Sequence, residues 1–568
     1  MRDKAGAAAL IAVFGLLVAV GCYRIPPVDV PWHLELGRLI VETGHFPVTN
    51  TFSWTFPDQP MTQQYPIFQP MVYLLVDRLG FGAFSLVNLV LWTGAALLWA
   101  RAAGTWTEAA RQPLLWFLVV LGIQRHHQPR PEVFTLLGLG LILACLEAWR
   151  RGHKGMIAGA PLATWMMVNG HQFWPLAVAI QVSWLVHLGM SRVSALTRLG
   201  FSDEDRDLAV LPPVLALLVS LVLIPLSPLG LRVYAAPLTM ADTLAELGGG
   251  GAAIAEFLPI WYDPTGTIVL AILIAVCAVR AVRARGRWSP FDFAVLAMGL
   301  VLVGAASRGL PIAAACAGVF ASRMRARSAP LLPDESPVHI AAALACVMMC
   351  AQLGWQLSTA PATLLGRQPG FGRTVGDWAD PTVAFLRESP PPGEMLNLGF
   401  VAGNPMIRVY PVKRVFVDPR LESYPRDFLH EAMAAERDPV VLNHLLAEWE
   451  PGFVVGEMRI PTVQGAVADL LDSGGWALVH ADSMLVVVVR RSAESAAYLA
   501  EYERRPEDVV IADYADDSRP VLLAQQRSRV ARLWVKLGRP DLAEPLLVLA
   551  RRQAQDPHVA AELATMVR

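Results

Sequence analysis

Long, uncharged apolar stretches recur along this chain, separated by short polar segments. Residues 208–226 and 340–357, for example, are each about long enough to cross the ~30 Å hydrocarbon core of a bilayer as a helix. The predicted fold class is therefore a polytopic α-helical membrane protein. Hydropathy predicts about eleven spanning helices, at residues 5–23, 83–101, 112–124, 132–149, 155–168, 172–190, 208–226, 266–284, 290–307, 311–322 and 337–357.

Two further segments are amphipathic. In residues 32–43 the apolar side chains lie near one helical face and the charged ones near the opposite face, and residues 67–79 show a similar pattern. Helices of this kind rest in the membrane interface. We expect both to belong to the first outer loop, residues 24–82, and to cover a lateral opening from the lipid.

Composition agrees with this class. The chain has 568 residues, 54% hydrophobic and 17% charged, with a mean hydropathy of +0.43, whereas soluble domains carry about 25% charged residues. The formal net charge of −1 gives no electrostatic reason to expect nucleic acid as a partner.

Lysine and arginine concentrate in one alternate set of loops, which includes Arg150–Lys154, Arg280–Arg287 and Arg323–Arg327. The positive-inside rule makes that set cytoplasmic. The N-terminus is then cytoplasmic, and the C-terminal third lies on the extracytoplasmic side of the membrane.

Polar and charged side chains gather on the predicted outer side, near helix ends that are far apart in the chain. Ionisable groups at membrane depth are costly and usually mark a function. We expect them to converge on one site; the alternative is that each is a separately solvated loop residue. The candidate residues are Asp29, His33, Glu35, Arg125, His126, His127, Arg130, Asn169, His171, Glu256 and Arg308.

These residue types suit transfer from a lipid-linked phosphate donor. Asp29 and Glu35 could act as general bases toward an acceptor hydroxyl or as metal ligands, and His33 could support either role. Carboxylates also suit a divalent cation, and whether one binds is left open. Arginine offers a planar, permanently charged fork, so the three arginines are expected to hold phosphate. The other candidates, His126, His127, Asn169, His171 and Glu256, would orient the sugar or the acceptor.

Several short motifs occur in the order found in a broad group of bacterial membrane proteins. They are Asp29-x-x-Trp-His-Leu-x-x-Gly-Arg-x-Ile, Gly44-x-x-Pro, Thr51-Phe-Ser-Trp-Thr, Arg130-Pro-Glu-Val-Phe-Thr, Val168-Asn-Gly-His, Arg308-Gly-Leu-Pro and Val415-Phe-Val-Asp-Pro-Arg-Leu-Glu-Ser-Tyr. On these motifs the chain resembles a group related to the GT-C glycosyltransferase superfamily. That superfamily includes protein O-mannosyltransferases, the aminoarabinose transferase of lipid A and oligosaccharyltransferases.

The resemblance implies a catalytic or metal-contacting acid in the first outer loop, and by position this residue is Asp29. The chain departs from the group's usual pattern at Pro27, where a second aspartate is usual. It also departs at Gln172, where the group often has glycine.

The C-terminal third has a different pattern. Residues 361–380 read as a linker. Short apolar runs at 395–398, 412–417, 453–455, 477–480 and 484–489 read as strands, and helices fit near 381–388, 425–435, 438–448 and 462–472. This predicts a small extracytoplasmic α/β domain over 381–492, with a mostly parallel sheet ending in an antiparallel hairpin. Asp418 follows the second of these runs, where it would either line a ligand edge or, as we favour, form a structural turn with Arg420.

Residues 493–568 are expected to form a helical tail. Trp534, Gly538 and Ala543 fit a tetratricopeptide-like helix pair, which would dock a protein partner or cap the domain. Residues 1–360 complete the division as a GT-C-like transmembrane domain.

The favoured function is an integral-membrane glycosyltransferase that moves a sugar from a polyprenyl-phosphate donor to a cell-envelope acceptor. Its expected partners are membrane lipid and the lipid-linked sugar. One alternative is a non-catalytic scaffold for envelope assembly. The other is a transporter or flippase of a lipid-linked substrate, although the centres of the predicted helices are apolar and no internal repeat is evident.

Overall fold

The computed structural model describes residues 2–61, 65–235, 237–238, 258–284, 287–327, 370–374, 376–509 and 520–553. Contacts between Cα atoms divide the chain into two compact units. The bundle unit comprises Met1–Tyr23, Gln63–Met71 and Gly82–Trp355, and the α/β unit comprises Arg24–Thr62, Val72–Phe81 and Gln356–Arg568. This grouping differs from the predicted division, because most of the first outer loop belongs with the C-terminal part.

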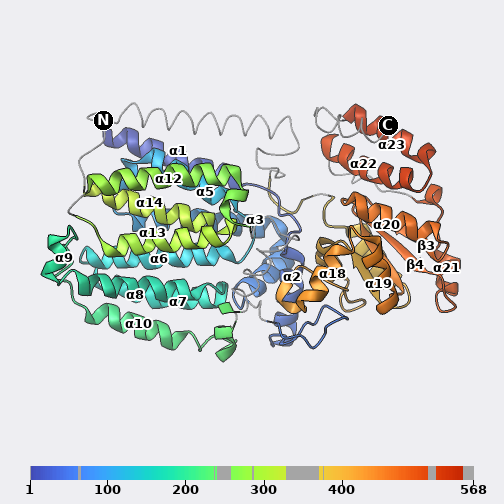
Figure 1. The fold of residues 1–568 in the computed structure, drawn as a ribbon, viewed down its shortest axis with the longest axis horizontal. Coiled ribbons are helices and arrows are strands. Elements are labelled where there is room, and N and C mark those ends of the chain that lie inside the picture. The colour runs from blue at the N-terminus through green and yellow to red at the C-terminus, as the bar shows by residue number, and fades with distance from the viewer. Residues whose placement is uncertain are drawn as a thin grey trace. The chain divides into compact units, whose positions relative to one another are not determined.

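The bundle unit consists of helices that run side by side (Figure 1). Ten of the predicted apolar helices coincide with helices of the structure; the eleventh, at 337–357, lies outside the described residues. The principal helices are α1 (Arg2–Gly21), α3 (Phe68–Ala102, bent at Gly80), α5 (Pro113–Arg125), α6 (Glu132–Arg150), α7 (Gly159–Gly170), α8 (Trp174–Met190), α10 (Leu211–Leu223), α12 (Pro264–Arg283), α13 (Pro290–Ala305) and α14 (Leu310–Ala326).

Three of these helices, α3, α6 and α12, are long and apolar enough to cross a membrane by length and composition. Five further apolar helices are shorter, so the predicted number of eleven spans stays a prediction. The outer faces of α10 and α12 are apolar and exposed, as at Leu215, Val222, Ile268 and Val279. Exposed apolar faces of this extent suit contact with lipid.

Small residues let the central helix α14 pack closely against its neighbours α5, α12 and α13. A Cβ atom added to Gly122 of α5 would lie 2.6 Å from the Cβ of Ala314, and one added to Gly299 of α13 would lie 2.9 Å from the Cα of Ala313. In lipid, hydrophobic burial supplies little driving force for helix association. Close backbone contacts of this kind, made possible by small residues, supply packing energy instead.

The bundle carries an ion-pair network at the end where α6 and α14 finish. Arg150 donates to Asp205 at 2.6 Å, and Arg323 contacts both Asp292 at 2.9 Å and Glu147 at 3.3 Å. Arginines that the sequence offers as orientation signals therefore also tie helices together at this end.

The α/β unit contains a four-stranded sheet with the order β1-β2-β4-β3. Its strands are β1 (Met395–Leu398), β2 (Phe453–Glu457), β3 (Trp476–Ala481) and β4 (Leu485–Arg490). The β1–β2 pair is parallel and the β2–β4 and β3–β4 pairs are antiparallel, so the prediction of a mostly parallel sheet is wrong.

The predicted strand at 412–417 is also wrong. The Asn397 side chain occupies the hydrogen-bonding groups of that segment: it accepts from the backbone of Phe416 at 2.9 Å and donates to the Val417 carbonyl at 2.8 Å. Val415 instead forms an isolated bridge with Ser53 of the first loop. The Asn397 side chain thus takes the place of a partner strand, and the apolar run in the sequence cannot reveal this.

Helices surround this sheet where the sequence predicts them, and the tail forms a helix pair (Figure 1). Gly538 supplies the turn of the pair with a φ of 67°, and Trp534 is buried as a core residue. Membership of a tetratricopeptide family stays a prediction. The helices are α16 (Asp380–Glu388), α18 (Arg426–Ala434), α19 (Pro439–Glu448), α20 (Pro461–Asp472), α21 (Ala496–Tyr502), α22 (Pro520–Lys536) and α23 (Pro540–Gln553).

The amphipathic helix α2 (Val30–Thr43) turns its apolar face into protein rather than toward a membrane interface. Trp32, Leu36 and Ile40 are at most 7% exposed, and α2 contacts α17 (Gly403–Met406) and the adjoining turn Ile407–Val409. The interfacial placement predicted for 32–43 therefore does not fit this helix, because its apolar side chains complete the core of the α/β unit.

A fully buried ion pair fixes the first loop to the α/β unit. Arg420 forms two parallel hydrogen bonds with Asp418, at 2.8 and 2.7 Å, and both side chains are 0% exposed. Arg420 also donates to Asn50 at 2.6 Å, and Tyr424 donates to Asp418 at 2.6 Å. The structural role favoured for Asp418 and Arg420 agrees with this geometry.

Replacing Asp418 with Asn should destabilise the protein by about 3–5 kcal/mol, because it leaves the buried Arg420 charge uncompensated. Thermal unfolding of the full chain in detergent measures the loss. Glu503→Gln is the matched control, since it breaks the exposed Arg491–Glu503 pair, which should be worth less than about 1 kcal/mol. Equal losses in the two variants would contradict the structural role of the buried pair.

Candidate functional site

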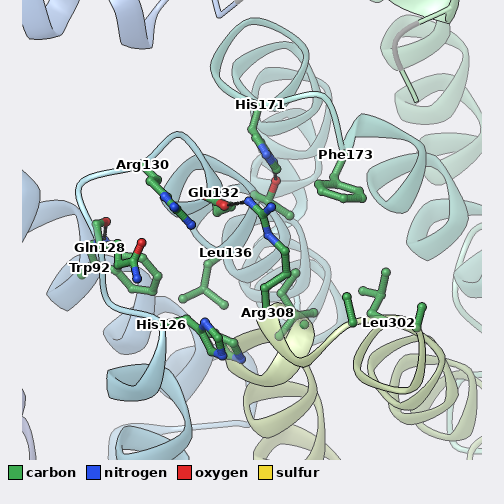
Figure 2. A pocket seen from close by; sticks show the side chains of 16 residues that line it. Trp92, His126, Gln128, Arg130, Glu132, Leu136, His171, Phe173, Leu302 and Arg308 are labelled. Atoms are coloured by element: carbon green, nitrogen blue, oxygen red, sulfur yellow. Dashed lines mark hydrogen bonds and ion pairs between the residues drawn. The ribbon is translucent and has the colours of Figure 1, made fainter. Parts of the chain in front are cut away.

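A cavity of about 90 Å³ lies in the bundle unit at the end where α6 and α14 begin. It is smaller than the ~300–1,000 Å³ of pockets that hold whole drug-sized ligands. Four separate stretches of the chain contribute side chains, at residues 92, 126–136, 171–173 and 302–312; Figure 2 shows their side chains around the cavity. The lining residues are Trp92, His126, Gln128, Arg130, Glu132, Thr135, Leu136, His171, Phe173, Leu302, Ala305, Ala306, Arg308, Gly309, Pro311 and Ile312.

Arg308 enters the cavity from a single 3₁₀ turn, Ser307–Gly309, between α13 and α14. The turn is anchored by a hydrogen bond from the Ser307 amide to the Leu258 carbonyl at 2.7 Å. The Arg308 guanidinium forms an ion pair with Oε1 of Glu132 in the first turn of α6 (Figure 2). This ion pair joins segments that are 176 residues apart.

The adjoining glycine makes this position of Arg308 possible. A Cβ atom on Gly309 would lie 2.7 to 2.9 Å from backbone atoms of Leu302 and Val303. Any other residue would therefore push the turn away from α13.

Arg130 and His126 come from the connection between α5 and α6. The loop is held by the Trp92 indole, which donates to the Gln128 carbonyl at 3.0 Å, and by the Arg130 amide, which donates to the same carbonyl at 2.9 Å. Arg130 is only 9% exposed, and its guanidinium lines the cavity. Two guanidinium groups, Arg130 and Arg308, thus belong to one small cavity.

His126 is neutral at physiological pH. Burial lowers its pKa to about 4, and the nearby positive charges of Arg308 and Arg130 act in the same direction, against a smaller opposite effect of Asp263. A site that disfavours a third positive charge is one that favours an anion.

His171 is held beside the first turn of α6. Its Nδ1 lies 2.6 Å from the Thr135 hydroxyl, and its ring packs near Tyr65 and Phe173. Burial lowers the pKa of His171 to about 3, so this imidazole is also neutral. A neutral imidazole can accept or donate a hydrogen bond, depending on its tautomer.

Three buried polar atoms of the lining have no hydrogen-bond partner within the described part of the chain: His126 Nε2, Gln128 Oε1 and Glu132 Oε2. Buried polar groups are nearly always satisfied in native proteins, by protein, by ordered water or by a ligand. The cavity thus combines cationic groups with acceptors that suit hydroxyl donors.

Among the described candidate residues of the bundle unit, three do not line the cavity: Arg125, His127 and Asn169. Arg125 is paired through two hydrogen bonds with Asp263, at 2.9 and 2.8 Å, and His127 is buried between Tyr23 and Trp92. Burial opposes ionisation of Asp263, but the hydrogen bonds from Arg125 and the Gly266 amide and the positive charge of Arg125 together outweigh it and lower the pKa of this carboxyl.

Asn169 joins structural elements, because its Oδ1 accepts from Ser227 at 2.9 Å and its carbonyl accepts from the Ile67 amide at 2.8 Å. Glu256 lies outside the described residues.

The three candidates for acid–base chemistry belong to the α/β unit. Asp29 precedes α2 with a φ of 60°, in the left-handed region that non-glycine residues seldom adopt. Glu35 is buried and accepts from Arg38 at 2.8 Å; burial raises its pKa, although Arg38 and Arg387 oppose this. His33 is 1% exposed, with its ring against Trp32.

Five polar or aromatic lining residues were not among the candidates: Trp92, Gln128, Glu132, Thr135 and Phe173. Glu132 and Thr135 could have been found from the sequence. They come shortly after Arg130 in the chain, and because they are three residues apart on α6 they lie on the same face of that helix. Trp92 could not, since nothing in its sequence surroundings sets it apart from the rest of an apolar helix.

Among the described residues, one group of three potential metal ligands comes together, Glu431 of α18 with His444 and Glu448 of α19. It is exposed or half-buried and includes none of the candidate residues. A divalent cation at Asp29 or Glu35 therefore stays a prediction.

Replacing Gly309 with Ala should destabilise the protein by about 1–3 kcal/mol, because the added Cβ meets backbone that cannot move aside. Gly304→Ala is the matched control. Gly304 lies in the last turn of α13, shortly before the turn that holds Gly309, and a Cβ atom added to it would meet nothing within 4 Å. Thermal unfolding in detergent should show a loss for Gly309→Ala alone, and a loss of equal size in Gly304→Ala would contradict the close packing.

The protein should lose stability as the pH falls from about 6.5 to about 4. In this window an unfolded histidine binds a proton while the folded His126 does not, so the unfolded state is favoured. His126→Gln should make the melting temperature less sensitive to pH over this range. His153→Gln, at an exposed position of the same unit, is the matched control; a control with as large an effect as His126→Gln would contradict the burial of a neutral His126.

No protein-family profile matches this chain, and no curated protein sequence matches it. Solved structures that share its fold include two archaeal oligosaccharyltransferase structures. The archaeal oligosaccharyltransferase AglB from Archaeoglobus fulgidus, in complex with an inhibitory peptide and a dolichol-phosphate, has a TM-score of 0.53 at 12% identity over 83% of this chain and 72% of that chain. The apo form of an Archaeoglobus fulgidus oligosaccharyltransferase has a TM-score of 0.52 at 11% identity over 86% of this chain and 74% of that chain. At these identities the similarity concerns the fold alone, and the chain has the fold of these oligosaccharyltransferases.

Proposed function

We propose that this chain is an integral-membrane glycosyltransferase that moves a sugar from a polyprenyl-phosphate-linked donor to an acceptor of the cell envelope. The observation that carries the proposal is the cavity in which Arg130 and Arg308 meet neutral histidines and apolar side chains. The fold similarity to AglB supports it, because that protein was captured with a lipid of the same chemical class, a dolichol-phosphate.

The two arginines would bind the phosphate of the donor. A guanidinium group forms charge-assisted hydrogen bonds to phosphate oxygens. In a partly buried cavity these bonds are stronger than at an exposed surface. Apolar lining from Leu302 and Ile312 would contact the first isoprene units. These groups would also stabilise the charge that builds up on the leaving phosphate.

The partnerless acceptors would orient the sugar. Glu132 Oε2 and Gln128 Oε1 can each accept from a sugar hydroxyl, and a neutral His126 can do so through Nε2. Trp92 and Phe173 add ring faces of the kind on which sugars stack. The cavity would therefore recognise a phosphosugar as a unit.

Asp29 keeps its proposed role as general base, with His33 and Glu35 in support. In the proposed reaction the acceptor oxygen forms a bond to the anomeric carbon while the bond from that carbon to the phosphate oxygen breaks. The hydroxyl proton goes to Asp29, and the polyprenyl phosphate leaves with the bonding electron pair. The left-handed φ of Asp29 supports this role, because such conformations cluster at functional sites.

The proposed location is a bacterial inner membrane, with the N-terminus in the cytoplasm and the α/β unit in the periplasm. The support for this orientation is the loop distribution of lysine and arginine. The tail helices α22 and α23 are proposed as the place where a protein partner would bind.

Arg308→Gln and Asp29→Asn should each reduce product formation by at least about a hundredfold, the scale on which a phosphate clamp or a general base acts. The measurement is mass spectrometry of envelope lipids and glycans from a host that lacks the gene and carries each variant. The phosphate contact is also read by binding of undecaprenyl phosphate to the purified chain.

Two controls are matched in residue type and unit. Arg206→Gln and Asp58→Asn replace exposed side chains of the bundle and α/β units, and both should retain product. Unchanged product in all four variants would contradict the enzymatic proposal and favour the scaffold alternative.

A further inference from the structure

Glu132 places a negative charge inside the cavity that is proposed to receive an anion. Its Oε1 forms the ion pair with Arg308, and its Oε2 is buried without a hydrogen-bond partner among the described residues. A carboxylate here is unexpected, because it competes directly with phosphate for the same guanidinium.

A second ion pair in the bundle unit shows how a purely structural pair is built. Asp263 uses both oxygens on Arg125, at 2.9 and 2.8 Å, and neither residue lines the cavity. Glu132 uses one oxygen on Arg308 and leaves the other buried, which is costly for a carboxylate. The Glu132–Arg308 pair is therefore the one that can gain by exchanging partners.

The charges of the lining fit one kind of phosphate better than another. Two guanidinium groups and one carboxylate leave a single net positive charge. A phosphodiester, in which phosphate joins lipid and sugar, carries one negative charge and would balance the cavity. A phosphomonoester, which remains after the sugar has left, carries a charge of about −1.5 to −2 near pH 7. That negative charge is larger than the single net positive charge of the lining.

We propose that Glu132 is an internal counter-anion of Arg308 that makes the cavity select a singly charged phosphodiester over a doubly charged phosphomonoester. In the empty cavity it holds Arg308, and the incoming phosphodiester takes its place on the guanidinium. After transfer, its negative charge repels the monoester product and promotes release. This inference rests on the proposed function, since it assigns the two phosphate forms to donor and product.

The test compares two lipid probes, undecaprenyl phosphate as the monoester and its methyl ester as the diester, on the full chain in detergent at pH 8. Dissociation constants are measured by native mass spectrometry. Glu132→Gln should tighten monoester binding about tenfold and diester binding about twofold to threefold, because removing one negative charge favours the more highly charged ligand.

Two further variants separate charge from shape. Asp263→Asn removes a carboxylate from the Arg125 pair and should change neither constant by more than about twofold. Glu132→Asp keeps the charge, so the ratio of the two constants should stay at the wild-type value even if the shorter side chain weakens both. A Glu132→Gln variant that binds both probes equally less well would show that Glu132 only positions Arg308, which would overturn the proposal.

Two further probes test the source of the phosphate. If undecaprenol binds as tightly as both phosphate lipids, the cavity binds no phosphate and the proposed function fails together with this inference. If inorganic phosphate binds as tightly as the lipids and responds to Glu132→Gln, the charge selection holds while the lipid-linked donor is contradicted. If Arg308→Gln abolishes lipid binding but Glu132→Gln leaves the ratio unchanged, only the role of Glu132 is contradicted.

Discussion

The ion pair between Arg308 and Glu132 is the interaction on which the cavity depends. It joins the turn before α14 to the first turn of α6, segments that are 176 residues apart. Each partner is about one-quarter exposed, so the pair is neither sealed in the core nor free in solvent. An ion pair in this position can hold a small polar cavity in shape and can still be exchanged for another anion.

The buried Asp418–Arg420 pair shows the opposite use of the same chemistry. There the carboxylate accepts two parallel hydrogen bonds from Arg420 and another from Tyr424, and Arg420 has a further partner in Asn50. Every strong interaction is made within the α/β unit, so nothing remains to attract a ligand. The completeness of the hydrogen bonding, rather than burial or residue type, separates the structural pair from the candidate functional one.

The sequence predicts most helices of the bundle because long apolar runs have few alternatives to a helix in a membrane. It also brings His126, Arg130, His171 and Arg308 to one end of the bundle, and the structure places all four on one cavity. What it cannot predict is competition for partners.

Arg125 has the same residue type and a similar position to Arg130, yet it is taken by Asp263. The segment 412–417 reads as a strand because it is a short apolar run, yet the Asn397 side chain occupies its backbone groups. The apolar face of α2, which the sequence predicts to rest on a membrane, completes a protein core. All three outcomes depend on residues distant in the chain.

The direction of the helices gives the cavity its electrostatic character before any side chain is counted. Both α6 and α14 begin there, and the N-terminal end of a helix carries a partial positive charge from its unbonded amide groups. Their C-terminal ends carry the ion-pair network of Arg150, Arg323 and Asp292. Glu132, in the first turn of α6, therefore lies where a negative charge is most stable in the empty protein, and the same field would favour the phosphate that replaces it.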